Sequence, residues 1–174
     1  MSGETLTTIV AIFLAAILIG IFPMMAIADR NDDISQISVQ NSITDFVDNV
    51  RKTGVIALDD YEGLVQEIYA TGNTYDITIE IQVLDSNPSK KTTQSTETKI
   101  GENIYYVEYT TNVMNKLNAS GKYILKEGDI VKVSASNTNT TISQSLKNFL
   151  YSLAGNNSYK IVASQTGVVA VNGS

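Results

Sequence analysis

A long uncharged segment lies near the N-terminus and sets the first limits on the fold. No charged side chain occurs between Leu6 and Ala28. As an α-helix this segment covers about 34 Å, which exceeds the hydrocarbon thickness of about 30 Å in a bilayer. A core helix of a small soluble domain is normally shorter and apolar on one face only. The sequence therefore predicts one membrane-spanning helix.

The same segment could in principle be removed during export. Ala26-Ile27-Ala28 fits the small-x-small pattern that precedes a signal-peptidase cut. A cleaved signal peptide also has a basic start and an apolar core of about 7–15 residues. Here the residues before Leu6 include no Lys or Arg, and the apolar run is longer. These features favour retention as an anchor over a cut after Ala28, and a cut after Gly3 is a third alternative.

Two patterns inside the segment suggest packing between helices. Ala11 with Ala15, and Ala16 with Gly20, place small residues one helical turn apart, which lets helix backbones approach closely in a membrane. Pro23 lacks an N–H group and should kink or locally melt the helix. Alternatively, Ala and Gly are simply frequent in spanning helices, and Pro23 marks the membrane boundary. Together with the acid Glu4, these are the candidate assembly residues.

Beyond the apolar run, residues 29–54 have the pattern of an amphipathic stem. Apolar side chains recur at approximately helical spacing and are expected on one stripe that packs on the following domain: Ile34, Ile37, Ile43, Phe46, Val47 and Val50. Arg51 and Lys52 suit the negative end of a helix, and Gly54 suits the position after it. Residues 1–54 are therefore expected to form one long helix, or two nearly collinear ones.

Residues 55–174 are expected to form a separate small domain. A helix is predicted from Asp59 to Thr71, with Asp59 and Glu62 at the spacing of a capping box. The next segment alternates between apolar and polar residues, which predicts a half-buried strand whose inward side chains are Tyr75, Ile77, Ile79, Ile81 and Val83. A polar loop follows from Asp85 to Lys99.

The second half of this domain gives mixed signals. Residues 102–121 contain three tyrosines with strand propensity, but their overall spacing favours a helix ending at Gly121. Two strands are expected around a turn at Gly128. Thr141 and Gln144 form a capping box that opens a helix with one apolar face, composed of Ile142, Leu146, Phe149, Leu150 and Leu153. A last strand follows Gly155. Helices on a mostly antiparallel sheet predict an α+β class.

Composition excludes several functions. The chain has 174 residues, a net charge of −6 and neither Cys nor His. Disulfides, imidazole triads and Cys/His zinc sites are therefore impossible, and the scattered basic residues disfavour nucleic-acid binding. Asp29, Asn31 and Asp33 match the start of a calcium loop, but the required glycine is missing. We expect no catalysis, no metal and no cofactor.

The layout resembles type IV pilin-like proteins, including the TadE-like minor pilins of tight-adherence systems. The residues that carry the resemblance are the apolar run with its internal Pro23, the nearby Glu4, and the stripe from Ile34 to Val50. The resemblance implies that the apolar half holds subunits in the membrane and then bundles in a filament core, where an acid near the N-terminus sets the register. Met1 and Ser2, before Gly3, carry no basic side chain, so we do not expect the basic leader of a prepilin here.

Two functions therefore remain open. One is a structural, membrane-anchored subunit of a cell-envelope assembly, whose partners are the membrane and sister or other envelope subunits. The alternative is a membrane-tethered domain that binds a ligand or a partner protein. The polar, Lys-poor remainder of the chain suggests that residues 55–174 lie outside the cytoplasm in either case.

Overall fold

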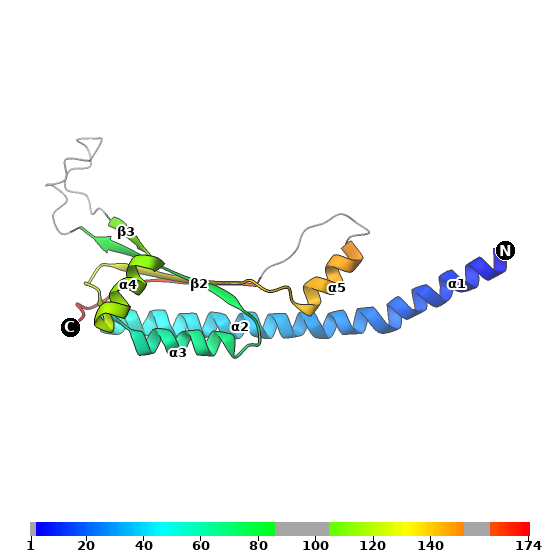
Figure 1. Ribbon diagram of the computed structural model, residues 1–174, viewed down its shortest axis with the longest axis horizontal. Helices are drawn as coiled ribbons and strands as arrows, with labels where there is room; N and C mark the ends of the chain where they lie inside the picture. Colours follow the sequence, from blue (N-terminus) through cyan, green and yellow to red (C-terminus); the bar gives the residue numbers. More distant parts are fainter. Residues whose placement is uncertain (1–2, 86–104, 152–160) are drawn as a thin grey trace, which may run out of the picture.

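A single helix runs the length of the molecule. The structure is a computed structural model that describes residues 3–85, 105–151 and 161–174. The helix comprises α1 (Gly3–Ala16), a π-helical turn (Ile17–Ile21) and α2 (Phe22–Thr53). It ends where Gly54 adopts a left-handed φ of 68° and donates its N–H to the carbonyl of Val50 at 2.8 Å. The expectation of one long stem helix closed by Gly54 is confirmed (Figure 1).

The remaining elements form an α+β head along the C-terminal half of this helix, as expected (Figure 1). In chain order they are β1 (Val55–Ala57), α3 (Leu58–Tyr69), β2 (Tyr75–Leu84), β3 (Tyr105–Tyr109), α4 (Thr110–Ser120), β4 (Lys122–Ile124), β5 (Ile130–Asn137), α5 (Ile142–Tyr151) and β6 (Val162–Val168). The described strands form an antiparallel sheet in the order β3-β2-β5-β6 and a small β1-β4 pair. The strands on either side of Gly128 thus exist, but they do not pair with each other.

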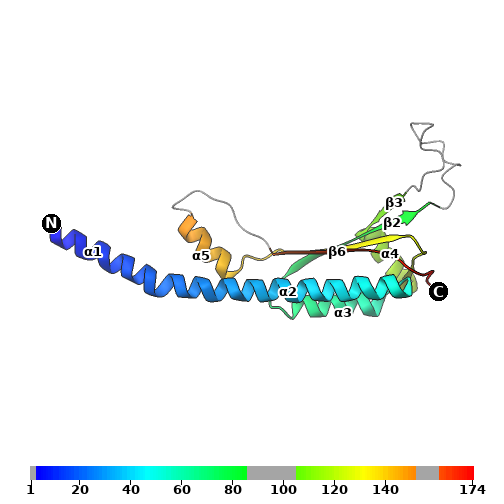
Figure 2. The same cartoon turned by 180° about the vertical axis from the view of Figure 1, so that it is seen from behind.

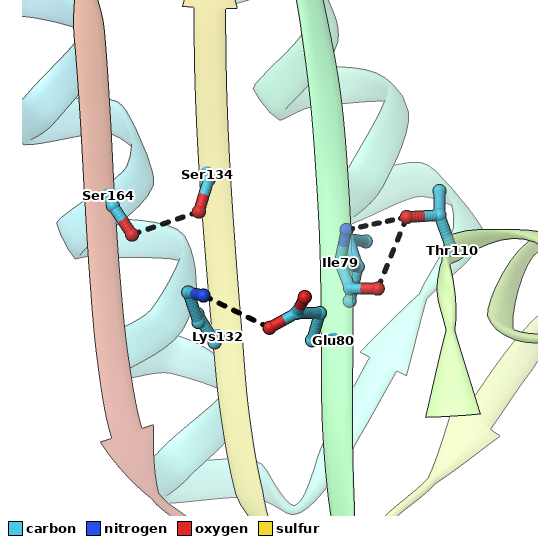
Figure 3. A network of polar contacts seen from close by, with 6 residues as sticks. All are labelled: Ile79, Glu80, Thr110, Lys132, Ser134 and Ser164. Atoms are coloured by element: carbon cyan, nitrogen blue, oxygen red, sulfur yellow. Dashed lines mark hydrogen bonds and ion pairs between the residues drawn. The ribbon is translucent and has the colours of Figure 1, made fainter. Parts of the chain in front are cut away.

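The face of the four-stranded sheet that is turned away from α2 carries polar side chains on its central strands (Figure 3). Glu80 and Lys132 face each other in register and form an ion pair at 3.0 Å, and the hydroxyls of Ser134 and Ser164 bond at 2.9 Å. Opposite charges and hydroxyl pairs at such cross-strand positions stabilise a sheet modestly. The alternation expected for residues 75–83 is therefore confirmed, with the apolar side chains on the inner face.

The core lies between this sheet and α2. Five fully or almost fully buried side chains of α2 contribute to it: Val39, Ile43, Phe46, Val47 and Val50. Ile34 and Ile37 were expected on the same stripe, and this is wrong, because both are exposed. Ile34 and Ile43 are nine residues apart in sequence, about two and a half turns of helix, so their side chains lie on opposite sides.

Side chains of α2 close the outer edge of the sheet at β6. The amide of Gln40 donates to the carbonyl of Ser164 and accepts from its N–H, both at 3.2 Å. Arg51 Nε donates to the carbonyl of Val168 at 3.1 Å. An open strand edge can template pairing with other chains, so these contacts protect the sheet at this edge.

Two local expectations are wrong. Helix α3 begins at Leu58 without a side-chain cap, so the Asp59–Glu62 capping box does not form. The carbonyl of Gly121 instead accepts the N–H of Leu58 at 2.9 Å, which satisfies a free donor of the first turn.

Residues 102–121 are not one helix either, because Tyr105–Tyr109 pair with β2 before α4 begins. Strand propensity thus prevails up to Tyr109.

Helix α5 begins as expected. The N–H of Gln144 bonds to the hydroxyl of Thr141, and the N–H of Thr141 bonds to the Gln144 side chain, each at 3.2 Å, which makes a complete capping box. The expected loop at residues 86–99 and the end of α5 at Leu153 and Gly155 lie outside the described residues.

Candidate functional site: the exposed stem and its junction with α5

The N-terminal half of the long helix projects beyond the head with its apolar side chains exposed. No residue of α1 is buried, and neither is any residue of the π-helical turn. The helix is long and apolar enough to cross a membrane by length and composition. Exposed apolar surface of this extent requires a lipid or protein environment, because water disfavours it.

Pro23 changes the helix at the point where sequence reasoning expected a disturbance. Pro23 is the second residue of α2, and the turn before it is π-helical, with the N–H of Phe22 bonded to the carbonyl of Ile17. A proline supplies no N–H, and a wider turn rearranges the hydrogen bonds around it. The helix therefore curves here without melting, as Figure 2 shows.

The small residues of this segment do not form one continuous surface. All four are exposed: Ala11, Ala15, Ala16 and Gly20. An α-helix rotates by about 100° per residue, so the face of Ala16 lies about 140° from that of Ala11. A Cβ added at Gly20 would meet no atom within 4 Å. The two pairs can therefore face two different neighbours. Glu4 lies in the first turn of α1, remote from them.

A second apolar surface continues along α2 past the uncharged run. We define the stem stripe as Ile27, Ile34 and Ile37, which are 64%, 56% and 61% exposed. Their spacing of seven and then three residues places them on one side of the helix. This side faces away from the core, since Ile34 is opposite Ile43. Sequence reasoning assigned Ile34 and Ile37 to the core and so missed the stripe; the helical angle from Ile43 was the available signal.

Helix α5 docks on α2 immediately after the uncharged run. The hydroxyl of Thr141 donates to Asp32 at 2.6 Å, the hydroxyl of Ser143 donates to Asp29, and Lys147 forms an ion pair with Asp29 at 2.6 Å. We call these five residues the α5 junction. Ser143 is buried, whereas Ile142 is 69% exposed. The first turns of α5 therefore bury polar side chains against the protein and leave Ile142 exposed together with Ser145, whereas a usual amphipathic helix buries its apolar side chains.

The junction changes the electrostatics of Asp29. Hydrogen bonds from Lys147 and Ser143 stabilise the carboxylate and lower the pKa of Asp29 below its ordinary value of 3.8, although partial burial opposes them. Asp29 is therefore charged at neutral pH and paired with Lys147. Asp29 and Asn31 lie within continuous helix, so they are not part of a calcium loop.

A pocket of about 510 Å³ lies at the other end of the head, between β3, α4 and β4. Lys116 lies 4.7 Å from the ring centre of Tyr123 and forms an ion pair with Glu108 at 2.7 Å. Burial, and then the nearby charge of Glu108, raise the pKa of Tyr123, so its hydroxyl stays protonated. Tyr105, Tyr106 and Tyr109 of the neighbouring strand are exposed. The expectation that at least one of the three is exposed is confirmed.

Within residues 3–85, 105–151 and 161–174, no three acidic side chains gather as a metal site would require. The absence of metals, cofactors and catalysis stays a prediction. No family model, curated protein or solved structure matches the chain.

Proposed function

We propose that this chain is a membrane-anchored, non-catalytic structural subunit that assembles in a cell envelope through its helical stem, with the head outside the cytoplasm. The observation that carries the proposal is the stem stripe. A simple anchor needs an apolar surface only as far as the lipid reaches. Ile34 and Ile37 continue that surface along α2, and the head leaves more than half of each side chain exposed.

The position of Ile37 argues against lipid as its cover. Ile37 lies nine residues beyond Ala28, about 13 Å further along the helix. The headgroup layer on each side of a bilayer is only about 5–8 Å thick. A neighbouring stem can cover both Ile34 and Ile37, and parallel helices commonly pack through apolar residues repeated at such spacings.

Rigidity of the stem supports the same function. The exposed half continues into α2 without a break, and the buried half of α2 is part of the head's core. A stem held in this way sets the orientation of the head when the stems bundle. Packing of this kind agrees with the pilin-like and TadE-like class that the sequence resembles.

Disulfide cross-linking in membranes tests the proposal. The chain has no Cys, so a single introduced cysteine reports one position only. Ile34→Cys should cross-link between copies on mild oxidation. Ile124→Cys, which is 50% exposed on β4 at the far end of the head, is the control and should not. If both variants remain monomeric in intact cells that express the chain with its natural partners, stem-to-stem assembly is wrong.

The second candidate function is a tethered binding domain. The pocket beside Lys116 and Tyr123, with exposed tyrosines next to it, favours this function, because exposed aromatic residues often mark contact surfaces. It requires that Tyr109→Ala or Lys116→Ala abolish binding of a partner while cross-linking through the stem is unchanged.

A further inference from the structure

Helix α5 packs on α2 at the point where the uncharged run ends. Both ribbon views show α5 starting close to α2 near the end of the sheet, then pointing toward the N-terminal end while sloping away from the long helix (Figures 1 and 2). In the α5 junction, the residues of α2 are Asp29 and Asp32, which lie just beyond Ala28, the last residue of the uncharged run. Asp29 and Asp32 lie one and four residues beyond Ala28, at most about 6 Å along the helix axis, so α5 starts level with the end of the uncharged run.

Part of the exposed surface of α5, formed by Ile142 and Leu146, is suited to lipid. Ile142 is exposed on that side, and Leu146, one turn later, is half-buried. The only charged residue of α5 is Lys147, and Asp29 neutralises it. A charge that must lie close to hydrocarbon is best tolerated when it is paired. The buried polar side chains of α5, Ser143 and Gln144, face the protein, whereas Ser145 and Asn148 are exposed beside the apolar pair, where an interfacial helix carries its polar side.

We propose that α5 is a membrane-surface helix, which inserts its exposed apolar side into the headgroup–acyl boundary next to the stem. The proposal rests on the anchoring part of the proposed function. Helices that lie in this boundary bury their apolar face about 5–10 Å deep. Because α5 presents no unpaired cation among its described side chains, binding needs apolar contact and not anionic headgroups. The occupant is therefore the lipid itself, and zwitterionic bilayers suffice.

Such a helix adds a second membrane contact to the stem. The first contact, α1, fixes the chain in the bilayer but leaves it free to rotate about the helix axis. A second contact on the side of α2 that carries the sheet restricts that rotation. The head is then held with its sheet side toward the α5 contact.

The test uses the full chain, reconstituted at high lipid excess in phosphatidylcholine vesicles. Three single-cysteine variants carry the same environment-sensitive fluorophore: Leu14→Cys in α1, Ile142→Cys in α5 and Ile124→Cys in β4. Quenching by a nitroxide attached near the top of the lipid acyl chains is compared with quenching by aqueous iodide.

The Ile142 probe is expected to be quenched several-fold more strongly by the lipid nitroxide than the Ile124 probe, and to be protected from iodide. A response equal to that of Ile124 would overturn the proposal. Protection of the Ile142 probe from iodide that disappears when the protein is diluted in lipid would also overturn the proposal, because a second copy of the chain, and not lipid, would then cover α5. If the Leu14 probe is itself exposed to iodide, the anchor fails, which distinguishes failure of the proposed function from failure of this inference.

Discussion

The side-chain amide of Gln40 forms both hydrogen bonds that a neighbouring strand would make with Ser164: it donates to the carbonyl and accepts from the N–H group. A single side chain of α2 thereby replaces one step of a β-ladder. This contact ties the stem helix to the sheet at the edge where another chain could otherwise pair.

Replacing Gln40 should therefore weaken the head and open its edge. We expect Gln40→Ala to lower the free energy of unfolding by about 1–2 kcal/mol, since it removes two hydrogen bonds. Urea unfolding in detergent, followed by circular dichroism, measures this change. Gln36→Ala, which loses one long contact to Val162, is the control and should cost less. Equal losses for the two variants would contradict the role of Gln40.

Two isoleucines of α2 should separate folding from assembly. Ile43 is fully buried, so Ile43→Ala should cost about 2–5 kcal/mol of unfolding free energy. Ile37→Ala should change that free energy by no more than about 0.5 kcal/mol, because its side chain is exposed. The same Ile37 variant should reduce cross-linking between stems. A stable Ile37→Ala variant with unchanged cross-linking would count against the stem stripe.

Gly54 should not tolerate a side chain. Its φ of 68° disfavours other residues by about 1–2 kcal/mol, and a Cβ there would overlap the backbone of Gly173 and Val171. We expect Gly54→Ala to lower the melting temperature clearly. Gly63→Ala is the matched control: Gly63 lies within α3 with open space around it, and alanine there should be neutral or stabilising by up to about 1 kcal/mol.

Gly20 and Glu4 should affect association without affecting the fold. A side chain at Gly20 meets nothing within the chain, so Gly20→Leu should leave the thermal unfolding of the head unchanged. It should nonetheless reduce self-association several-fold if stems approach closely at Ala16 and Gly20. Glu4→Ala tests in the same way whether the acid near the N-terminus sets the register between stems. Energy transfer between labelled copies in vesicles measures both variants, and unchanged transfer would make the segment a passive anchor.

The α5 junction should weaken in acid. The pKa of Asp29 is lower in the folded state than its ordinary value of 3.8, so its charge stabilises the junction fully above that value. That contribution disappears as the pH falls below 3.8 and through the folded pKa. A nitroxide at Ser145→Cys should therefore become mobile in that range. When Asp29→Asn is added to the labelled Ser145→Cys variant, the nitroxide should be more mobile at neutral pH. Equal mobility with and without Asp29→Asn would contradict the α5 junction.

Much of the architecture could be predicted because its signals are local. The uncharged run, Gly54 at the helix end and the Thr141–Gln144 capping box each depend on residues close in sequence. The disturbance at Pro23 follows from its missing N–H group, although its π-helical form depends on how the neighbouring carbonyls find donors. The strand at residues 75–83 was predictable from a strict two-residue period.

The remaining features depend on distant partners. Spacing alone shows that α5 has an apolar side, but not that Asp29 and Asp32 hold its polar side inward. The start of α3 depends on the carbonyl of Gly121, more than sixty residues away in the chain. Residues 105–109 became a strand because β2 offers an edge to pair with. The stem stripe could have been found from helical angles, whereas the β6 edge contacts could not.

The exposed apolar half of the long helix joins its core-packed half without a linker, and this continuity has a mechanical consequence. Rotation of the exposed half about the helix axis turns the head through the same angle. A tilt of that half displaces the far end of the head more than it displaces the stem. Torque applied at either end is thus transmitted to the other, with only the curvature at Ile17–Ile21 available to absorb it.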